Sequence, residues 1–329
     1  MISSKSSYLT IFAFVLLLPV NETLGQDGNV FRNSGIEVPS ATDRPEGVIE
    51  VNAIFDGYSV NYINDVVYAS YGARDVVLNL LMPTLNTNEP YPLVMFVQGS
   101  AWLPQNVYST LPIFVDLART GYVIASIEYR HSREAIAPAQ AQDVKSAIRF
   151  MRANAERYNI NPNKVAIWGT SSGGHLAALT GTSDGEESFL TADNLEQPSN
   201  VQAVIDFFGP TDFRRMDDHP SQITHNNPGS PESLVVGGPI QEPEQEALVN
   251  SYNPITYIRA NKEIPPFLIV HGDVDNLVPF NQSVLLYNAL QEAGKEVTFY
   301  RINGGGHGPG IFSNAMMSIV KEFLDLHLD

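Results

Sequence analysis

A serine between two glycines stands where an apolar run gives way to a helical pattern. Ser171 is the middle residue of Gly169–Gly173, which reads Gly-Thr-Ser-Ser-Gly, and the preceding residues Val165–Trp168 are apolar. A serine on a sharp strand-to-helix turn is lifted clear of its sheet, and the flanking glycines let the two arms of the turn approach each other. The pattern therefore predicts that Ser171 is a nucleophile.

The helix expected after this turn offers backbone N–H groups to developing negative charge. The first amides of a helix have no partner within it, and the helix dipole favours an anion at that end. Ser172 directly follows the predicted nucleophile. Its amide is therefore a candidate donor to an oxyanion.

His307 is the candidate for the base that a serine nucleophile needs. It lies in a Gly-Gly-Gly-His-Gly run just after Val297–Ile302, which is predicted to be the last strand. The glycines leave a core histidine little to pack against, and they allow the imidazole to reach the serine. We therefore predict that His307 accepts the serine proton.

Two aspartates compete for the role of the acid that orients this base. Both lie in His271–Pro279, which reads HGDVDNLVP. Asp275 is deeper in the loop, whereas Asp273 is nearer the strand end and could brace the turn by accepting backbone N–H bonds. The spacing favours Asp275 but leaves both open, since either carboxylate could reach an imidazole.

The other histidines are expected to have structural or surface roles. His175 lies one turn into the helix after the nucleophile and is predicted to brace neighbouring loops, and His271 is predicted to be structural. His219 and His225 lie near two aspartates in a polar segment, but their spacing is irregular for a metal site. We expect both on the solvated surface, and we predict no metal and no cofactor.

Strands and helices alternate through the rest of the chain. Alternating apolar and polar residues around a Tyr-Gly-Ala turn predict an antiparallel hairpin first. Later strands are expected at 93–97, 122–127, 165–168, 201–208, 267–271 and 297–302, and helices at 109–120, 139–158, 172–179, 280–293 and 311–326. This alternation predicts an α/β fold with a mostly parallel, doubly wound sheet, in which the loops after the strands meet at one edge.

Three segments depart from this alternation. Residues 210–254 are polar and rich in proline, and an insertion of this length is usually functional, so we predict a short lid beside the site. Residues 26–60 are predicted to form an irregular arm, which leaves 61–329 as the folded domain. Residues 1–25 combine Lys5, a short apolar run and a small-residue cleavage site, which is typical of a cleavable signal peptide.

Composition and charge indicate which partners the protein is not expected to bind and where it is expected to be located. The apolar run near the N-terminus is too short to span a bilayer, so we expect secretion or a periplasmic location without stable membrane insertion. The chain has 329 residues, 43% of them hydrophobic, and its formal charge of −17 disfavours nucleic acid as a partner. The absence of cysteine excludes disulfides and a thiol nucleophile.

Taken together, the motifs resemble those of α/β-hydrolase-fold esterases. The resemblance is to bacterial carboxylesterases related to the hormone-sensitive-lipase group and to acetylxylan and feruloyl esterases, and it covers about residues 62–328. It implies that Ser171 is the nucleophile, Asp275 the acid and His307 the base. The segments that carry it are the GTSSGGHLA, HGDVDNLVP and GGGHG motifs, with EYR at 128–130, PAQ at 138–140, DVK at 143–145 and NPI at 253–255.

The same resemblance implies a second source of oxyanion donors. A His-Gly-Gly-Gly-Trp loop in those enzymes aligns with Gln98–Trp102, which reads QGSAW. Ser100 and Ala101 replace glycines that adopt positive φ readily, but a backbone donor needs no particular side chain. The amides of Ser100 and Ala101 are therefore expected to act with that of Ser172. Trp102 is expected either to wall the acyl pocket or to be a core residue.

The resemblance implies a secreted serine ester hydrolase that cleaves short-chain carboxylic esters through an acyl-enzyme. The expected substrate is a small ester or an acylated carbohydrate. Alternatives are a polysaccharide deacetylase or feruloyl esterase, an exported serine peptidase, and a non-catalytic binding domain of the same fold. A complete set of nucleophile, acid and base argues against the last of these.

Overall fold

A computed structural model describes residues 46, 49, 59–84 and 89–328 of the chain. The chain divides into two units, Met1–Asn52 and Ala53–Asp329, and every helix and strand described below belongs to the second. The predicted signal peptide lies outside the described residues, as does the predicted arm apart from residues 46, 49, 59 and 60.

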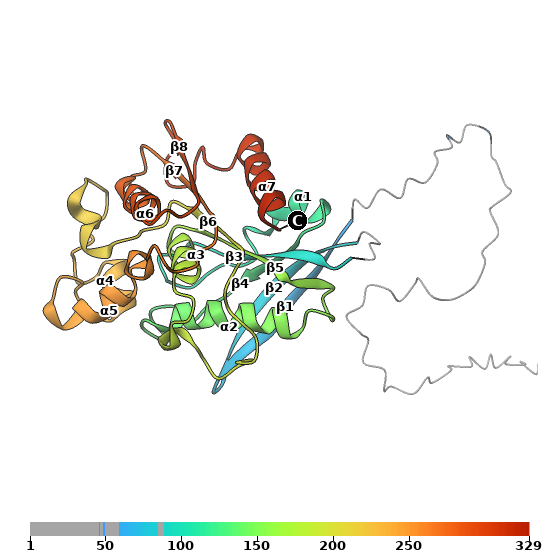
Figure 1. Cartoon of the computed structure of the whole chain (residues 1–329), viewed down its shortest axis with the longest axis horizontal. Coiled ribbons are helices and arrows are strands. Elements are labelled where there is room, and N and C mark those ends of the chain that lie inside the picture. The colour runs from blue at the N-terminus through green and yellow to red at the C-terminus, as the bar shows by residue number, and fades with distance from the viewer. Residues whose placement is uncertain (1–45, 47–48, 50–58, 85–88, 329) are drawn as a thin grey trace, which may run out of the picture. The chain divides into compact units, whose positions relative to one another are not determined.

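An eight-stranded sheet forms the centre of the second unit (Figure 1). Its order is β1-β2-β4-β3-β5-β6-β7-β8, in which β2 is antiparallel to β1 and β4 and all other pairs are parallel. This arrangement confirms the predicted fold class. The strands are β1 (Val60–Tyr71), β2 (Arg74–Pro83), β3 (Tyr91–Val97), β4 (Val123–Ile127), β5 (Ile160–Thr170), β6 (Ala203–Phe207), β7 (Phe267–Gly272) and β8 (Val297–Ile302).

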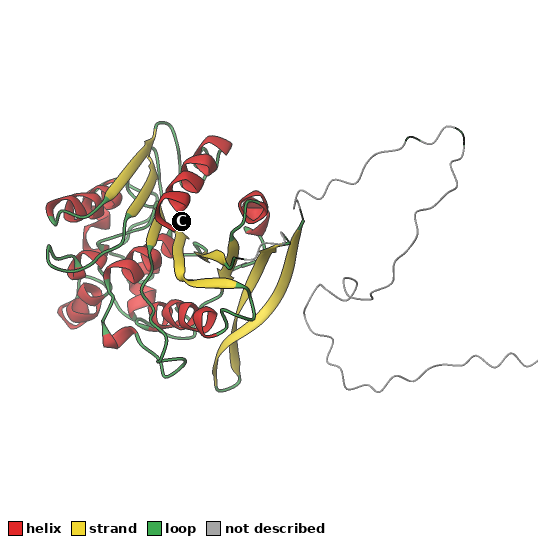
Figure 2. Ribbon diagram, turned by 45° about the vertical axis from the view of Figure 1, so that its right-hand side comes forward, coloured by secondary structure: helices red, strands yellow, loops and turns green. Residues whose placement is uncertain are grey.

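Helices cover both faces of this sheet (Figure 2). Apolar side chains of α2, α3 and α6 pack into the core on one face, and those of α1 and α7 pack into a separate core on the other. The five helices are α1 (Val115–Arg119), α2 (Ala139–Ala153), α3 (Ser172–Thr182), α6 (Asn281–Glu292) and α7 (Asn314–Leu328). No helix in the described part of the chain is both long enough and apolar enough to cross a membrane.

Two helices are shorter than the apolar periodicity predicts. The helix expected over residues 109–120 consists of a 3-10 turn, Leu111–Phe114, followed by α1. Helix α2 ends at Ala153 rather than near residue 158, because the side chain of Asn154 donates to the carbonyl oxygen of Phe150 and so satisfies a group of the last turn.

The segment between β6 and β7 contains short helices that its sequence pattern does not predict. They are α4 (Pro231–Val236), α5 (Glu246–Ser251) and 3-10 turns at Phe213–Asp218, Pro243–Gln245 and Pro254–Tyr257. Helix α4 has strong local signals, since Ser230 accepts a hydrogen bond from the amide of Ser233 and Gly237 ends the helix with a φ of 77°. One and a half turns are too few for an apolar period to appear.

Candidate active site

The turn between β5 and α3 holds Ser171 in a strained backbone conformation. Its φ of 52° and ψ of −125° lie outside the regions that residues with side chains ordinarily occupy. A Cβ atom on Gly169 would lie 1.9 Å from the carbonyl oxygen of Gly173, and one on Gly173 would lie 2.0 Å from that of Val97. The close packing around Ser171 therefore requires glycine at both positions.

Ser171, His307 and Asp275 form a continuous chain of hydrogen bonds. The Nε2 atom of His307 lies 3.0 Å from Ser171 Oγ, and its Nδ1 atom lies 2.8 Å from Asp275 Oδ2. This geometry suits an imidazole that donates from Nδ1 to the carboxylate and accepts the serine proton at Nε2. The ring also packs edge-on against Phe208, with centroids 4.8 Å apart, which limits its rotation.

The surroundings of Asp275 stabilise its ionised form. Its Oδ1 atom accepts the amides of Leu277 and Val278 at 2.8 and 3.0 Å, and its Oδ2 atom lies 3.3 Å from His271 Nε2. Burial alone raises the pKa of this carboxyl, but the contacts with His271 and His307 outweigh burial, and the pKa lies well below its ordinary value. Asp275 is therefore a carboxylate at neutral pH.

Asp273 braces the turn of the same loop. Its Oδ2 atom lies 2.7 Å from Arg301 Nη2, and its Oδ1 atom accepts the amide of Gly304 at 2.6 Å. These two donors lower its pKa. None of its contacts in the described residues involves His307, so only one of the two competing aspartates contacts the imidazole.

Two other histidines support the loops around the site from inside the core. His175 is fully buried and its Nε2 atom lies 2.7 Å from the carbonyl oxygen of Tyr252, while burial lowers its pKa to about 4. His271 is also buried, with Nδ1 2.7 Å from Ser283 Oγ and Nε2 3.0 Å from the carbonyl oxygen of Val278. The contacts with Tyr252 and Val278 connect α3 and β7 to segments beside the site, and the contact with Ser283 connects β7 to α6.

The loop after β3 presents a different set of amides from the one that the sequence predicts. The amide of Ser100 donates to Ser172 Oγ at 2.9 Å and is therefore occupied. The amides of Ala101 and Ser172 have no acceptor within the described residues, and both residues line the same cavity as Ser171. The structure thus leaves two of the three predicted oxyanion donors free, and the third positions the loop.

This loop is strained at one position where glycine is expected and at the tryptophan that follows it. Ala101 and Trp102 have φ values of 55° and 53°, in the left-handed region that disfavours side chains. The hydroxyl of Ser100 counters the strain by donating to the carbonyl oxygen of Leu103 at 2.6 Å, and it lies 3.0 Å from the hydroxyl of Tyr129. Hydrogen bonds of the Ser100 side chain therefore stabilise this loop, in which the resembled enzymes have glycines instead.

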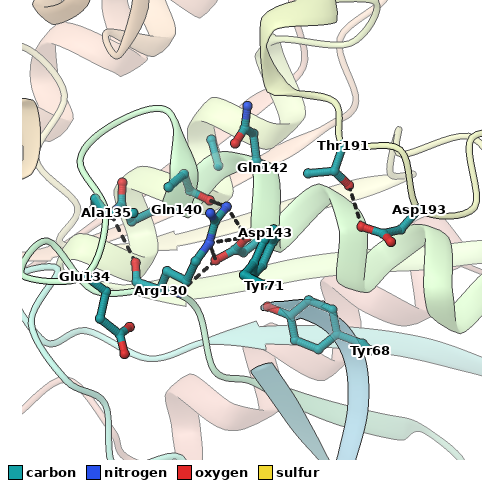
Figure 3. Close-up of polar contacts among 12 residues, drawn as sticks. Tyr68, Tyr71, Arg130, Glu134, Ala135, Gln140, Gln142, Asp143, Thr191 and Asp193 are labelled. Atoms are coloured by element: carbon teal, nitrogen blue, oxygen red, sulfur yellow. Dashed lines mark hydrogen bonds and ion pairs between the residues drawn. The ribbon is translucent and has the colours of Figure 1, made fainter. Parts of the chain in front are cut away.

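A network of polar side chains anchors the segment that follows Tyr129 (Figure 3). Arg130 Nη2 lies 2.7 Å from Asp143 Oδ1, and the amide of Arg130 donates to Asp143 Oδ2 at 2.8 Å. The hydroxyl of Tyr71 donates to the same carboxylate at 2.6 Å, and its ring centroid lies 3.5 Å from the guanidinium carbon of Arg130. The network connects the hairpin and α2 to the segment after β4, whose Tyr129 hydroxyl lies 3.0 Å from that of Ser100 in the loop after β3.

A cavity of about 300 Å³ opens beside Ser171. Trp102 lines it and is also 99% buried, with its ring edge-on to those of His175 and Phe213, so this residue is both cavity wall and core. The lining comes from the loops after four strands and from the segment between β6 and β7, with Gly99–Trp102, Thr170–Ser172, Phe208, Pro210, Ile223, His225, Pro231, Glu232, Leu277, Val278 and His307.

The expectation of a solvated surface is wrong for His225 and correct for His219. His225 is 1% exposed, and its Nδ1 atom lies 3.0 Å from Glu232 Oε1. A carboxylate partner offsets the cost of burying the imidazole, which explains its location. His219 is exposed. No cluster of metal-ligating side chains occurs among the described residues.

Asp206 lies opposite Gly169, in the strand next to the one that leads to Ser171, and the pKa of its carboxyl is raised. This β6 residue is 1% exposed; its Oδ1 atom accepts the amide of Gly209 at 2.9 Å, whereas its Oδ2 atom has no partner in the described residues. Burial raises the pKa of Asp206 to about 7, and the Gly209 amide offsets only part of that effect.

We expect the Asp206→Asn variant to gain stability relative to the wild type as pH rises. The folded-state pKa of Asp206 is raised, so its contribution is fully present below the unfolded pKa of about 4 and is lost as pH rises through about 7. The difference in unfolding free energy should change by about 1.4 kcal/mol per pH unit within that window. Urea unfolding of both proteins at about pH 5 and about pH 7 measures it, and an unchanged difference contradicts the raised pKa.

Known proteins resemble this chain in sequence and in fold. Residues 78–290, more than half of the chain, match the BD-FAE family. The probable carboxylic ester hydrolase LipM of Mycobacterium tuberculosis is 30% identical over 265 residues, which cover 79% of this chain and 58% of LipM. The chain therefore spans less than three fifths of the length of that relative.

Two solved structures with similar folds are at least 31% identical to this chain. A truncated carbohydrate esterase from gut microbiota superposes with a TM-score of 0.73 at 35% identity, over 83% of this chain and 98% of that one. A bifunctional GH43-CE protein of Bacteroides eggerthii superposes with a TM-score of 0.74 at 31% identity, over 84% of this chain and 36% of that one. By sequence match and by architecture, the chain belongs to the BD-FAE family and has the α/β-hydrolase fold.

Proposed function

We propose that the protein is a serine carboxylic ester hydrolase that forms an acyl-enzyme. The observation that carries the proposal is the hydrogen-bonded chain from Ser171 through His307 to Asp275, which opens into a cavity with two free amides. Similarity to a probable carboxylic ester hydrolase and to a carbohydrate esterase supports it. A non-catalytic binding domain would have no use for this alignment of nucleophile, base and acid.

In the proposed reaction, Ser171 Oγ attacks the ester carbonyl while His307 Nε2 takes its proton. The carbonyl oxygen becomes an oxyanion. It accepts hydrogen bonds from the amide of Ala101, in the loop after β3, and from the amide of Ser172, at the N-terminus of α3. The imidazolium, stabilised by Asp275, then protonates the departing alcohol. Water attacks the acyl-enzyme with His307 again acting as base, which releases the acid and restores the serine.

Acylated carbohydrates are the substrates that we favour within this class. The cavity of about 300 Å³ is at the lower end of the range for small-molecule sites, which suits a short acyl group. Two of the similar structures are a carbohydrate esterase and a GH43-CE protein, which supports a carbohydrate as the alcohol half of the ester. The second candidate function, a polysaccharide deacetylase, is the case in which that carbohydrate is a polymer and the acyl group is acetyl. Export remains part of the proposal on the strength of the N-terminal sequence alone.

Labelling by a fluorophosphonate, together with a panel of esters, tests the proposed function. We expect stoichiometric labelling of the peptide that contains Ser171, and hydrolysis of aryl acetate in preference to aryl octanoate, because the cavity is small. Acetate release from acetylated xylan distinguishes the deacetylase. An unlabelled protein that is inert on every ester contradicts the hydrolase and favours a binding domain.

A further inference from the structure

A buried carboxylate in the wall of the cavity has no part in the proposed reaction. Glu232 lies in the first turn of α4, lines the same cavity as Ser171 and His307, and has a side chain only 3% exposed. Its Oε1 atom lies 3.0 Å from His225 Nδ1, but its Oε2 atom has no hydrogen-bond partner in the described residues. A buried carboxylate oxygen without a donor is unfavourable, and a bound substrate could supply that donor.

His225 holds the Glu232 carboxylate at the cavity wall. The Nε2 atom of His225 lies 3.2 Å from both the carbonyl oxygen of Leu277 and Ser221 Oγ, which leaves Nδ1 facing Glu232. Burial lowers the pKa of His225, but the carboxylates of Glu232 and Asp217 outweigh it, and the pKa lies above its ordinary value. One carboxylate oxygen therefore lies beside His225, whereas the other is buried and has no partner among the described residues.

The free oxygen of Glu232 calls for a ligand that donates a hydrogen bond. An ionised carboxylate can only accept hydrogen bonds, so the free oxygen of Glu232 favours a group with a proton to donate. His225 Nδ1 already lies 3.0 Å from the other oxygen, so one hydroxyl is enough to give the free oxygen a donor, and a hydrogen bond to a carboxylate is stronger than one between neutral groups. The last torsion of a glutamate side chain has a broad energy well, so this oxygen can turn toward a hydroxyl that enters the cavity.

We propose that Glu232 determines specificity by accepting a hydrogen bond from a hydroxyl group of the bound ester. The inference rests on the proposed function and narrows its substrates to esters that also carry a hydroxyl group. That hydroxyl belongs either to the alcohol half, as in a partly acetylated sugar, or to the acyl half, as in a hydroxylated aromatic acid. In both cases the substrate supplies the donor that the free oxygen of Glu232 lacks.

Matched pairs of esters test this inference. The first pair is a methyl xyloside monoacetate and cyclohexyl acetate, which lacks the ring hydroxyls, and the second is methyl 4-hydroxycinnamate and methyl cinnamate. We expect the wild type to favour the hydroxyl-bearing member of one pair by about tenfold or more in kcat/KM. The pair that shows this preference identifies which half of the ester carries the hydroxyl.

Two variants of Glu232 separate hydrogen bonding from packing. Glu232→Met keeps the length of the side chain but removes the acceptor. It should lower kcat/KM for the preferred hydroxyl-bearing ester about 10- to 100-fold, and it should change kcat/KM for the hydroxyl-free ester of the same pair by less than about threefold. Glu232→Gln retains an amide oxygen and should fall between the wild type and Glu232→Met. Thermal unfolding of each variant checks that the fold is intact.

Each outcome of this experiment decides the inference. Equal losses on both members of each pair indicate a structural role and overturn it. A wild type that hydrolyses phenyl acetate through Ser171 but has no preference for hydroxyl-bearing esters overturns it as well, and does so even if Glu232→Met fails to fold. A wild type that hydrolyses no ester overturns the proposed function itself.

Discussion

Replacing Ser171 by alanine lowers kcat for ester hydrolysis by at least about 10⁴-fold. The substitution removes only Oγ, the atom that lies 3.0 Å from His307 Nε2 and opens into the cavity. The other hydroxyls that line the cavity in the described part of the chain make different contacts: that of Ser172 accepts the amide of Ser100, that of Thr170 accepts the amide of Gly99, and that of Ser100 donates to the carbonyl oxygen of Leu103. Initial rates with phenyl acetate, together with the loss of fluorophosphonate labelling, measure the effect.

Ser172→Ala is the matched control for this result. It removes a hydroxyl from the adjacent residue and keeps both free amides, but it deprives the amide of Ser100 of its acceptor at 2.9 Å. We therefore expect about a tenfold loss, which reflects a looser oxyanion loop. The assignment of the nucleophile is wrong if Ser171→Ala retains activity comparable to that of Ser172→Ala.

The fold and the main site residues could be predicted because each depends on local pattern. The strand patterns identify the parallel strands, and Ser171, Asp275 and His307 each lie in the turn or loop after one of them. Parallel strands bring the loops at their carboxyl ends to one edge of the sheet, so adjacency in space follows from position after a strand. The choice between Asp273 and Asp275 needed the resemblance, because spacing alone fixes neither loop conformation nor side-chain direction.

The features that sequence reasoning missed depend on tertiary contacts. His225 and Glu232 are seven residues apart in a segment without apolar periodicity, and their pairing requires the turn that leads into α4. The occupied amide of Ser100 depends on a side chain 72 positions away. Asp206 is hidden in a strand whose other residues are apolar, and no sequence signal marks the missing partner of its Oδ2 atom.

Asp275→Asn should lower kcat by about 10³- to 10⁴-fold, because the amide imposes the wrong tautomer on the imidazole. The backbone amides of Leu277 and Val278 require an acceptor at the position of Oδ1, at 2.8 and 3.0 Å. The oxygen of the asparagine takes that position, so its NH2 group faces His307 Nδ1. A donor there makes Nδ1 the acceptor and places the proton on Nε2, which can then no longer accept the proton of Ser171.

Asp273→Asn provides the matched comparison in the same loop. Its contacts are with Arg301 and the amide of Gly304, and an asparagine oxygen can still accept one of these donors. We therefore expect kcat to stay within about threefold of the wild type. Saturation kinetics on phenyl acetate for both variants measure the difference. If Asp273→Asn is the inactive variant and Asp275→Asn retains activity, the acid is Asp273 and the loop must rearrange in solution, because only Asp275 contacts the imidazole here.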